Sequence, residues 1–170
     1  MTDIIFLALL IVHIGTVILW MGASVLFVSV LGPSIAKLSG SSRADLFKAI
    51  GSRYEGYVVR NATIAIAAGL ILYAYITQVA TSLAPSDSGK PWLLIGILFG
   101  LAAYIIGIAI VIRDNRGLMR LMSQTPTGQV APATPSTEVI RLQRRVAMGA
   151  GLQALFLVIA LLSMVVGANL

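Results

Sequence analysis

Four long stretches without a single charged residue constrain this chain of 170 residues more than any other feature. They cover residues 4–36, 61–86, 91–112 and 146–170. Each is longer than the roughly 20 residues that an α-helix needs to cross about 30 Å of hydrocarbon. A helix also satisfies its own backbone hydrogen bonds where no water is present. The pattern predicts an all-α, four-transmembrane-helix bundle, with spans at about 4–31, 61–83, 92–112 and 146–168.

Composition leads to the same class of protein. Charged residues make up 11% of the chain, against about 25% in soluble domains, and the mean hydropathy is +0.96. The chain has no cysteine, which excludes disulfides, thiolate metal sites and cysteine redox chemistry. The first apolar stretch is longer than a signal-peptide core and no basic segment precedes it, so we expect it to be retained. We therefore predict one integral membrane domain over residues 1–170.

The distribution of Lys and Arg predicts the orientation in the membrane. Eleven of the twelve lie in the connections after the first and third stretches, and the middle connection holds only Lys90. Basic connections stay in the cytoplasm, which places both termini on the outer side of the cell (plasma) membrane. No nucleic-acid motif accompanies the net charge of +6. The expected partners are membrane lipids and other integral membrane subunits, contacted through Arg141, Arg144 and Arg145.

The connections carry their own signals. Gly32-Pro33 should end or bend the first helix. Ser41 or Ser42 is a candidate N-cap for an amphipathic cytoplasmic stretch that leads into the second helix and either lies on the membrane or packs on a partner. Segment 123–134 is rich in Pro, Thr and Ser and predicts a mobile loop. Thr134-Pro135 then resembles the start of the last helix.

Small residues indicate where helices approach closely. The third and fourth stretches contain glycines at GxxxG-like spacing, which permits backbones to pack tightly within lipid. Either internal bundling or contact with another subunit would use them. The candidate packing positions are Gly96, Gly100, Gly107, Gly149 and Gly151.

Polar residues within the predicted spans are the main candidates for function, because such residues are costly in a bilayer. Four of them lie about 12 to 20 Å from one boundary of their span, counting 1.5 Å per residue. They could form one midplane polar cluster, or each could hydrogen-bond separately to a neighbouring helix. The four are His13, Tyr73, Tyr104 and Gln153.

His13 is the only histidine and the one candidate cofactor ligand. Copper and zinc sites need several nitrogen or sulfur ligands, and no second ligand lies at its depth. Copper or haem binding would thus require ligands from another chain, and we expect neither a cofactor nor a metal site within this one. The predicted spans also contain no acidic residue, so paired-carboxylate, triad and proton-relay chemistry lack their components. We do not expect an enzyme.

The segments HIGTVILWMGA (residues 13–23) and LGPSIAKL (31–38), followed by the basic amphipathic stretch, resemble the copper-resistance D-like family of four-helix membrane domains. The resemblance covers the first half of the chain. It implies copper handling, or haem synthesis in more distant relatives, and only His13 and Trp20 carry over by position. Those activities are expected to use further histidines in later helices, and this chain has none.

These observations predict a non-catalytic accessory or assembly subunit of a larger membrane protein complex, such as a redox or metalloenzyme complex. The alternative is a copper or haem handling membrane protein of the resembled family that uses His13. A small transporter is disfavoured because the spans lack charged groups.

Overall fold

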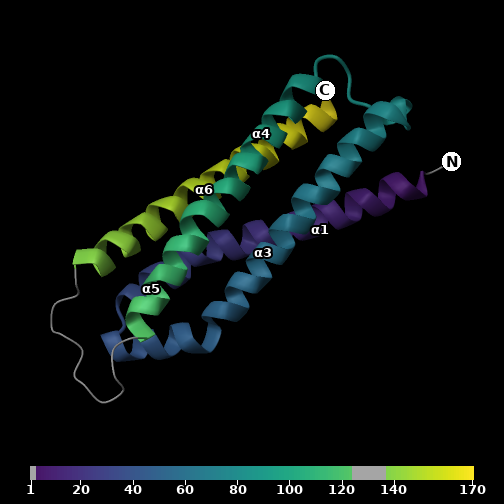
Figure 1. Cartoon of the computed structure of the whole chain (residues 1–170). Helices are drawn as coiled ribbons and strands as arrows, with labels where there is room; N and C mark the ends of the chain where they lie inside the picture. Colours follow the sequence, from purple (N-terminus) through teal and green to yellow (C-terminus); the bar gives the residue numbers. More distant parts are fainter. Residues whose placement is uncertain (1–2, 124–136) are drawn as a thin grey trace.

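All regular secondary structure in the described residues, 3–123 and 137–170 of a computed structural model, is helical. Figure 1 shows the arrangement. In chain order the elements are α1 (Ile4–Leu26), the π-helical turn η1 (Phe27–Leu31), α2 (Gly32–Ala36), α3 (Gly40–Gln78), the 3-10 turn η2 (Thr81–Leu83), α4 (Lys90–Ile106), the π-helical turn η3 (Gly107–Ile112), α5 (Arg113–Ser123) and α6 (Thr137–Asn169).

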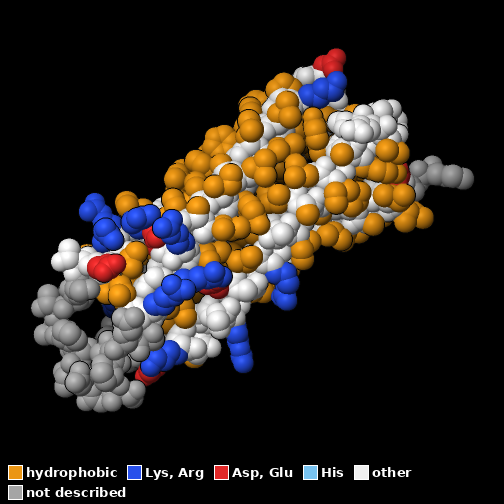
Figure 2. Space-filling view, viewed as in Figure 1, with side chains coloured by type: hydrophobic (Ala, Val, Ile, Leu, Met, Phe, Trp, Pro, Cys, Tyr) orange, Lys and Arg blue, Asp and Glu red, His pale blue; other side chains and the backbone are white. Residues whose placement is uncertain are grey.

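Several of these elements follow one another without a break and form four long rods. The rods are long and apolar enough to cross a membrane, which confirms the all-α, four-helix prediction and identifies a multi-pass membrane protein by length and composition. Their bounds are Ile4–Ala36, Ser41–Gln78, Lys90–Leu121 and Thr137–Asn169. Figure 2 shows apolar side chains covering the length of the rods, with most Lys and Arg gathered at one end.

The rods associate as two pairs. α1 packs mainly on α3, and α4 packs mainly on α6. Both termini lie at the same end of the molecule in Figure 1, which we call the terminal end. There Asp3 caps α1 by accepting from the Phe6 backbone N–H, and its other oxygen accepts from the Tyr75 hydroxyl at 2.8 Å. Both bonds lower the pKa of Asp3, and the bond from the Phe6 backbone N–H has the larger effect. We call the opposite end, which carries α5 and the first turns of α6, the basic end.

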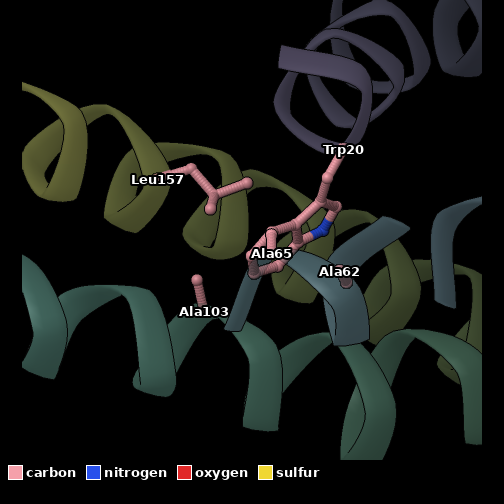
Figure 3. Packing of buried hydrophobic residues seen from close by; sticks show 5 residues of the cluster. All are labelled: Trp20, Ala62, Ala65, Ala103 and Leu157. Carbon is pink, nitrogen blue, oxygen red and sulfur yellow. The ribbon is translucent and has the colours of Figure 1, made fainter. Parts of the chain in front are cut away.

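The pairs meet around one aromatic side chain, Trp20 of α1, which is 2% exposed. Figure 3 shows its indole between the helices, surrounded by Ala62 and Ala65 of α3, Ala103 of α4 and Leu157 of α6. The alanines matter because a methyl side chain lets helices come close enough for the large ring to touch several of them. Trp20 also meets Tyr104 edge-on, with ring centroids 6.3 Å apart.

The structure differs from the predicted boundaries in several places. α3 ends at Gln78 instead of continuing to residue 83, and the chain turns through η2 into Ala84, whose extended backbone is the form favoured before a proline. The cap of α3 is Ser39, which accepts from the Ser42 backbone N–H, and not Ser41 or Ser42. The loop expected over 123–134 and the Thr134-Pro135 start lie outside the described residues, apart from Ser123, which ends α5.

Gly32-Pro33 neither ends nor simply bends the first rod. The helix instead widens into η1 just before Pro33 and continues through α2. Proline has no N–H to donate and its ring crowds the preceding turn, and a π-helical turn is one way to accommodate both effects. A second π-helical turn, η3, lies in the third rod before α5. Such turns are rare and occur frequently at functional sites.

Candidate functional site

Both π-helical turns face one cavity between the four rods, in the half of the bundle nearer the basic end. Its volume is about 70 Å³ and its walls are mostly apolar. η1 contributes Phe27 and Leu31, and η3 contributes Val111 and Ile112. Leu46, Phe47 and Ile50 of the amphipathic stretch also line it. The apolar side of that stretch therefore packs in part on the chain's own helices, and the stretch is continuous with α3 as expected.

One of the polar groups lining this cavity is the amide of Gln153, on α6. Gln153 is 5% exposed, and among the described residues no hydrogen bond involves its side chain. A Cβ atom at Gly107 would lie 3.1 Å from both its Nε2 and its Oε1. Gly107 thus leaves the space that the amide occupies, at the point where η3 begins.

Polar groups near the cavity connect the two rod pairs and also connect α1 with α3. The Tyr54 hydroxyl donates to the Ala23 carbonyl at 2.8 Å, and its ring stacks on Phe27 at 5.5 Å. Glu55 of α3 forms an ion pair with Arg116 of α5, with Nε 2.7 Å from the carboxylate oxygen. The Glu55 side chain is 13% exposed, so this pair is partly shielded from water.

His13 lies on the face of α1 that packs against α3. Its Nδ1 is 2.9 Å from the carbonyl oxygen of Ala65. A carbonyl can only accept, so Nδ1 donates and carries the proton in the neutral ring. Gly69, one turn further along α3, makes room for the ring, because a Cβ there would lie 2.6 Å from His13 Cε1.

We expect Gly69→Ala to lower the free energy of unfolding by about 1 to 3 kcal/mol, the usual cost of overpacking a tight contact. The new methyl group must displace the imidazole and so break its bond to Ala65. Chemical denaturation in mixed micelles measures the effect. In a His13→Ala background the same Gly69→Ala change should be neutral or stabilising by up to about 1 kcal/mol, because alanine is the better helix former once the clash is gone. Equal costs in both backgrounds would show that the ring and the glycine are not coupled.

The four residues of the expected midplane cluster do not join. Tyr104 shares a hydrogen bond of 3.0 Å with Thr63 of α3, and Tyr73 lies near Lys90 at the start of α4, toward the terminal end. Within the described residues, no hydrogen bond links any two of the four. His13 and Tyr104 instead each bond to a neighbouring helix, and Gln153 lines the cavity nearer the basic end.

The candidate packing glycines fall into two groups. At three of them an added Cβ atom would crowd a neighbouring side chain. It would lie 2.6 Å from Met164 if built on Gly96, 3.1 Å from Gln153 if built on Gly107, and 3.0 Å from Ile110 if built on Gly149. A Cβ at Gly100 or Gly151 would meet nothing within 4 Å, so among the described residues these two do not form close crossings. The tightest crossing involves a pair that spacing did not single out. A Cβ at Gly89 would lie 2.4 Å from the carbonyl oxygen of Gly167.

The three candidate headgroup arginines have different surroundings. Arg145 contacts Asp114 of α5, with Nε 2.8 Å from Oδ2, while Asp114 is 6% exposed. The short distance makes this an ion pair, although its angle is not that of a hydrogen bond. Arg141 lies 4.0 Å from Glu138 and both side chains are exposed. Arg144 is exposed.

The donor set does not fit copper or haem on its own. Across residues 3–123 and 137–170, no three His, Cys, Asp or Glu side chains gather as a metal site would require. His13 supplies one imidazole, and the nearest polar partner of its ring is a backbone carbonyl. A cofactor at His13 would need the rest of its ligands from elsewhere.

The two ion pairs and the cavity were not predicted. Glu55, Asp114 and Arg116 lie outside the predicted spans, so sequence reasoning treated them as solvated connections. Helical spacing does indicate that Asp114 is buried, because this residue continues the period of the buried positions in the third rod. No family model, curated protein or solved structure matches the chain.

Proposed function

We propose that this protein is a non-catalytic accessory or assembly subunit of a larger membrane protein complex. The observation that carries the proposal is that polar side chains within the rods connect one helix to another. His13 bonds to the Ala65 carbonyl, Tyr54 to the Ala23 carbonyl and Tyr104 to Thr63. Polar groups in a membrane are costly and are kept for a purpose. Here their donors and acceptors serve to hold the bundle together.

The first rod offers the surface for a partner. In its most apolar stretch of 18 residues only 6% of the stretch is buried within the chain, whereas the corresponding share for the last rod is 33%. On its uncovered side, Ile11 and Ile18 are more than half exposed, and a Cβ at Gly15 or Gly22 would meet nothing within 4 Å. Alternating isoleucine and glycine gives ridges and hollows that suit a transmembrane helix of another subunit.

The orientation follows from the distribution of charge. The basic end carries most of the Lys and Arg side chains (Figure 2), and such segments remain in the cytoplasm of cell membranes. On this proposal the amphipathic start of α3 and the arginines of α5 and α6 face the cytoplasm. Both termini then face the outside, where cytoplasmic partners cannot reach them.

Site-specific cross-linking tests the proposal, because a chain without cysteine allows one thiol to be placed at will. Ile18→Cys puts the thiol on the uncovered side of α1, and Leu98→Cys is the matched control on α4, since the two residues are 63% and 66% exposed. In native membranes, a short reagent that alkylates the thiol at one end and inserts into a neighbouring C–H or N–H bond on illumination at the other should join Ile18→Cys to one partner of defined mass. Leu98→Cys should give no such adduct.

Two results of this cross-linking experiment would contradict the subunit proposal. If both variants remain uncross-linked, and native mass spectrometry after mild solubilisation finds only this chain, the subunit proposal fails. Adducts at both positions with many masses would indicate random collisions in the membrane and would also count against it.

Copper or haem handling through His13 is the second candidate, and one observation favours it. The bond from Nδ1 to the Ala65 carbonyl holds the ring in the way that orients metal-ligating histidines and leaves Nε2 as the ligating atom. The remaining ligands would come from another chain. An absorption spectrum and metal analysis of the gently purified complex test it. A Soret band or stoichiometric copper that His13→Ala removes would support this candidate, and their absence would reject it.

A further inference from the structure

A broad groove runs between α5 and α6 at the basic end, separate from the cavity with Gln153. Its volume is about 840 Å³. Five arginines line it: Arg113, Arg116 and Arg120 from α5, and Arg141 and Arg145 from α6. Two carboxylates, Asp114 and Glu138, also line it. The lining residues thus carry three more positive than negative charges, and Glu55, which pairs with Arg116, lowers the local excess to two. The arginines approach from both helices.

The internal ion pairs position these arginines without using all their donors. Asp114 contacts Nε of Arg145, and Glu55 contacts Nε and one terminal nitrogen of Arg116. Each guanidinium has five N–H donors, so donors remain on both. Arg113 is exposed and has no ion pair among the described residues. Such a set of planar, fixed donors suits the oxygens of a phosphate group.

The groove is apolar on the side toward the spans. Val59 of α3 and Ile108 and Ile112 of η3 continue its wall beyond the arginines. Ile108 is 40% exposed and lies in the apolar part of the third rod. A ligand that fills the groove therefore meets arginines at one end and a hydrocarbon surface at the other. A free inorganic anion would use only the first of these surfaces.

We propose that this groove binds one anionic phospholipid, with its phosphate among the arginines and the start of an acyl chain along Val59, Ile108 and Ile112. Basic pockets between helices near the membrane surface bind such headgroups. The site is independent of the proposed subunit role, because every residue in it belongs to this chain. A lipid held here bridges α5 and α6, which also contact each other through the Asp114–Arg145 ion pair and through the packing of Gly117 on Leu142.

The test uses the full chain, purified in a neutral detergent and titrated by native mass spectrometry. The probes are phosphatidylglycerol, phosphatidylcholine with the same acyl chains, and soluble glycerol phosphate. We expect one phosphatidylglycerol to bind, at least about ten-fold more tightly than phosphatidylcholine. The double variant Arg113→Gln/Arg141→Gln should weaken this binding about 30-fold, which corresponds to about 1 kcal/mol for each arginine.

Arg144→Gln is the matched control, because Arg144 is exposed on α6 beside Arg145 but does not line the groove. It removes a charge of the same kind and should change the affinity less than about two-fold. Ile108→Asn tests the apolar wall of the groove while all its arginines are present. It also provides a second test of the lipid site if the double arginine variant does not purify. It should weaken phosphatidylglycerol binding.

Three results would overturn the proposal. Equal binding of both phospholipids would mean that the headgroup charge is not recognised. Displacement by glycerol phosphate at the same concentration as the lipid would assign the groove to a free phosphate compound. An equal loss of affinity in Arg144→Gln would mean that diffuse surface charge, and not the groove, attracts the lipid.

Discussion

Replacing Arg145 with glutamine is expected to lower the free energy of unfolding by about 2 to 3 kcal/mol. The reason is the carboxylate left behind, since Asp114 is 6% exposed and Arg145 is its cation. Removing one partner of a buried ion pair costs about 3 to 5 kcal/mol. We expect less here because the Arg145 side chain is 49% exposed, so water screens part of the interaction.

Chemical denaturation in mixed micelles measures this change, followed by far-ultraviolet circular dichroism. The double variant Asp114→Asn/Arg145→Gln should recover most of the lost stability, because no unpaired charge remains buried. Arg144 directly precedes Arg145 and is exposed. Arg144→Gln should therefore change the free energy of unfolding by less than about 0.5 kcal/mol. If Arg144→Gln and Arg145→Gln have equal effects, the contact with Asp114 does not stabilise the fold.

Gly89→Ala should have an effect of similar size at the opposite end. Its new methyl group would lie 2.4 Å from the carbonyl oxygen of Gly167 and 3.3 Å from Pro85. The first contact is with backbone, which cannot rotate away, so α4 and α6 must separate. We expect a loss of about 2 to 3 kcal/mol, in the range for overpacked sites.

Gly100→Ala provides the control within α4, the helix that Gly89 precedes as its N-cap. Gly100 is buried, yet a Cβ there meets nothing within 4 Å. Alanine is the better helix former by roughly 0.5 to 1 kcal/mol, so this variant should match or exceed the stability of the parent protein. A comparable loss in both variants would mean that the general response of α4 to alanine, and not the crossing with Gly167, sets the cost.

Hydropathy was sufficient to predict the four rods because a span is a local property of some 20 residues. It could not predict where the helices end. The third apolar stretch stops at Ile112, but the helix continues through the charged residues of α5, where packing on α6 and not hydropathy maintains it. Charge counting therefore treated Asp114 and Arg116 as part of a solvated connection.

The site depends on pairings that no local pattern contains. His13 and Ala65 are 52 positions apart, and Glu55 and Arg116 are 61 apart. Their contacts require the relative rotation and depth of two helices, and an error of one residue turns a side chain by about 100°. The predicted cluster of His13, Tyr73, Tyr104 and Gln153 used depth alone. Depth does not determine which neighbour a side chain contacts, and within the described residues no hydrogen bond joins any two of the four.

The π-helical turn η3 has a consequence for how this chain tolerates insertions and deletions. A π-helical turn accommodates one extra residue within an α-helix, and each residue of a regular helix accounts for about 100° of rotation. Losing a single residue within Gly107–Ile112 would therefore restore a regular helix and leave α5 facing α6 as before. The same loss within the regular helix of α4, with the turn kept, would rotate all of α5 by about 100°. Asp114 would then face away from Arg145, and the basic groove would be dismantled, although hydropathy would be almost unchanged. Among homologues, one-residue deletions should therefore occur within this six-residue turn and not in the regular helix before it.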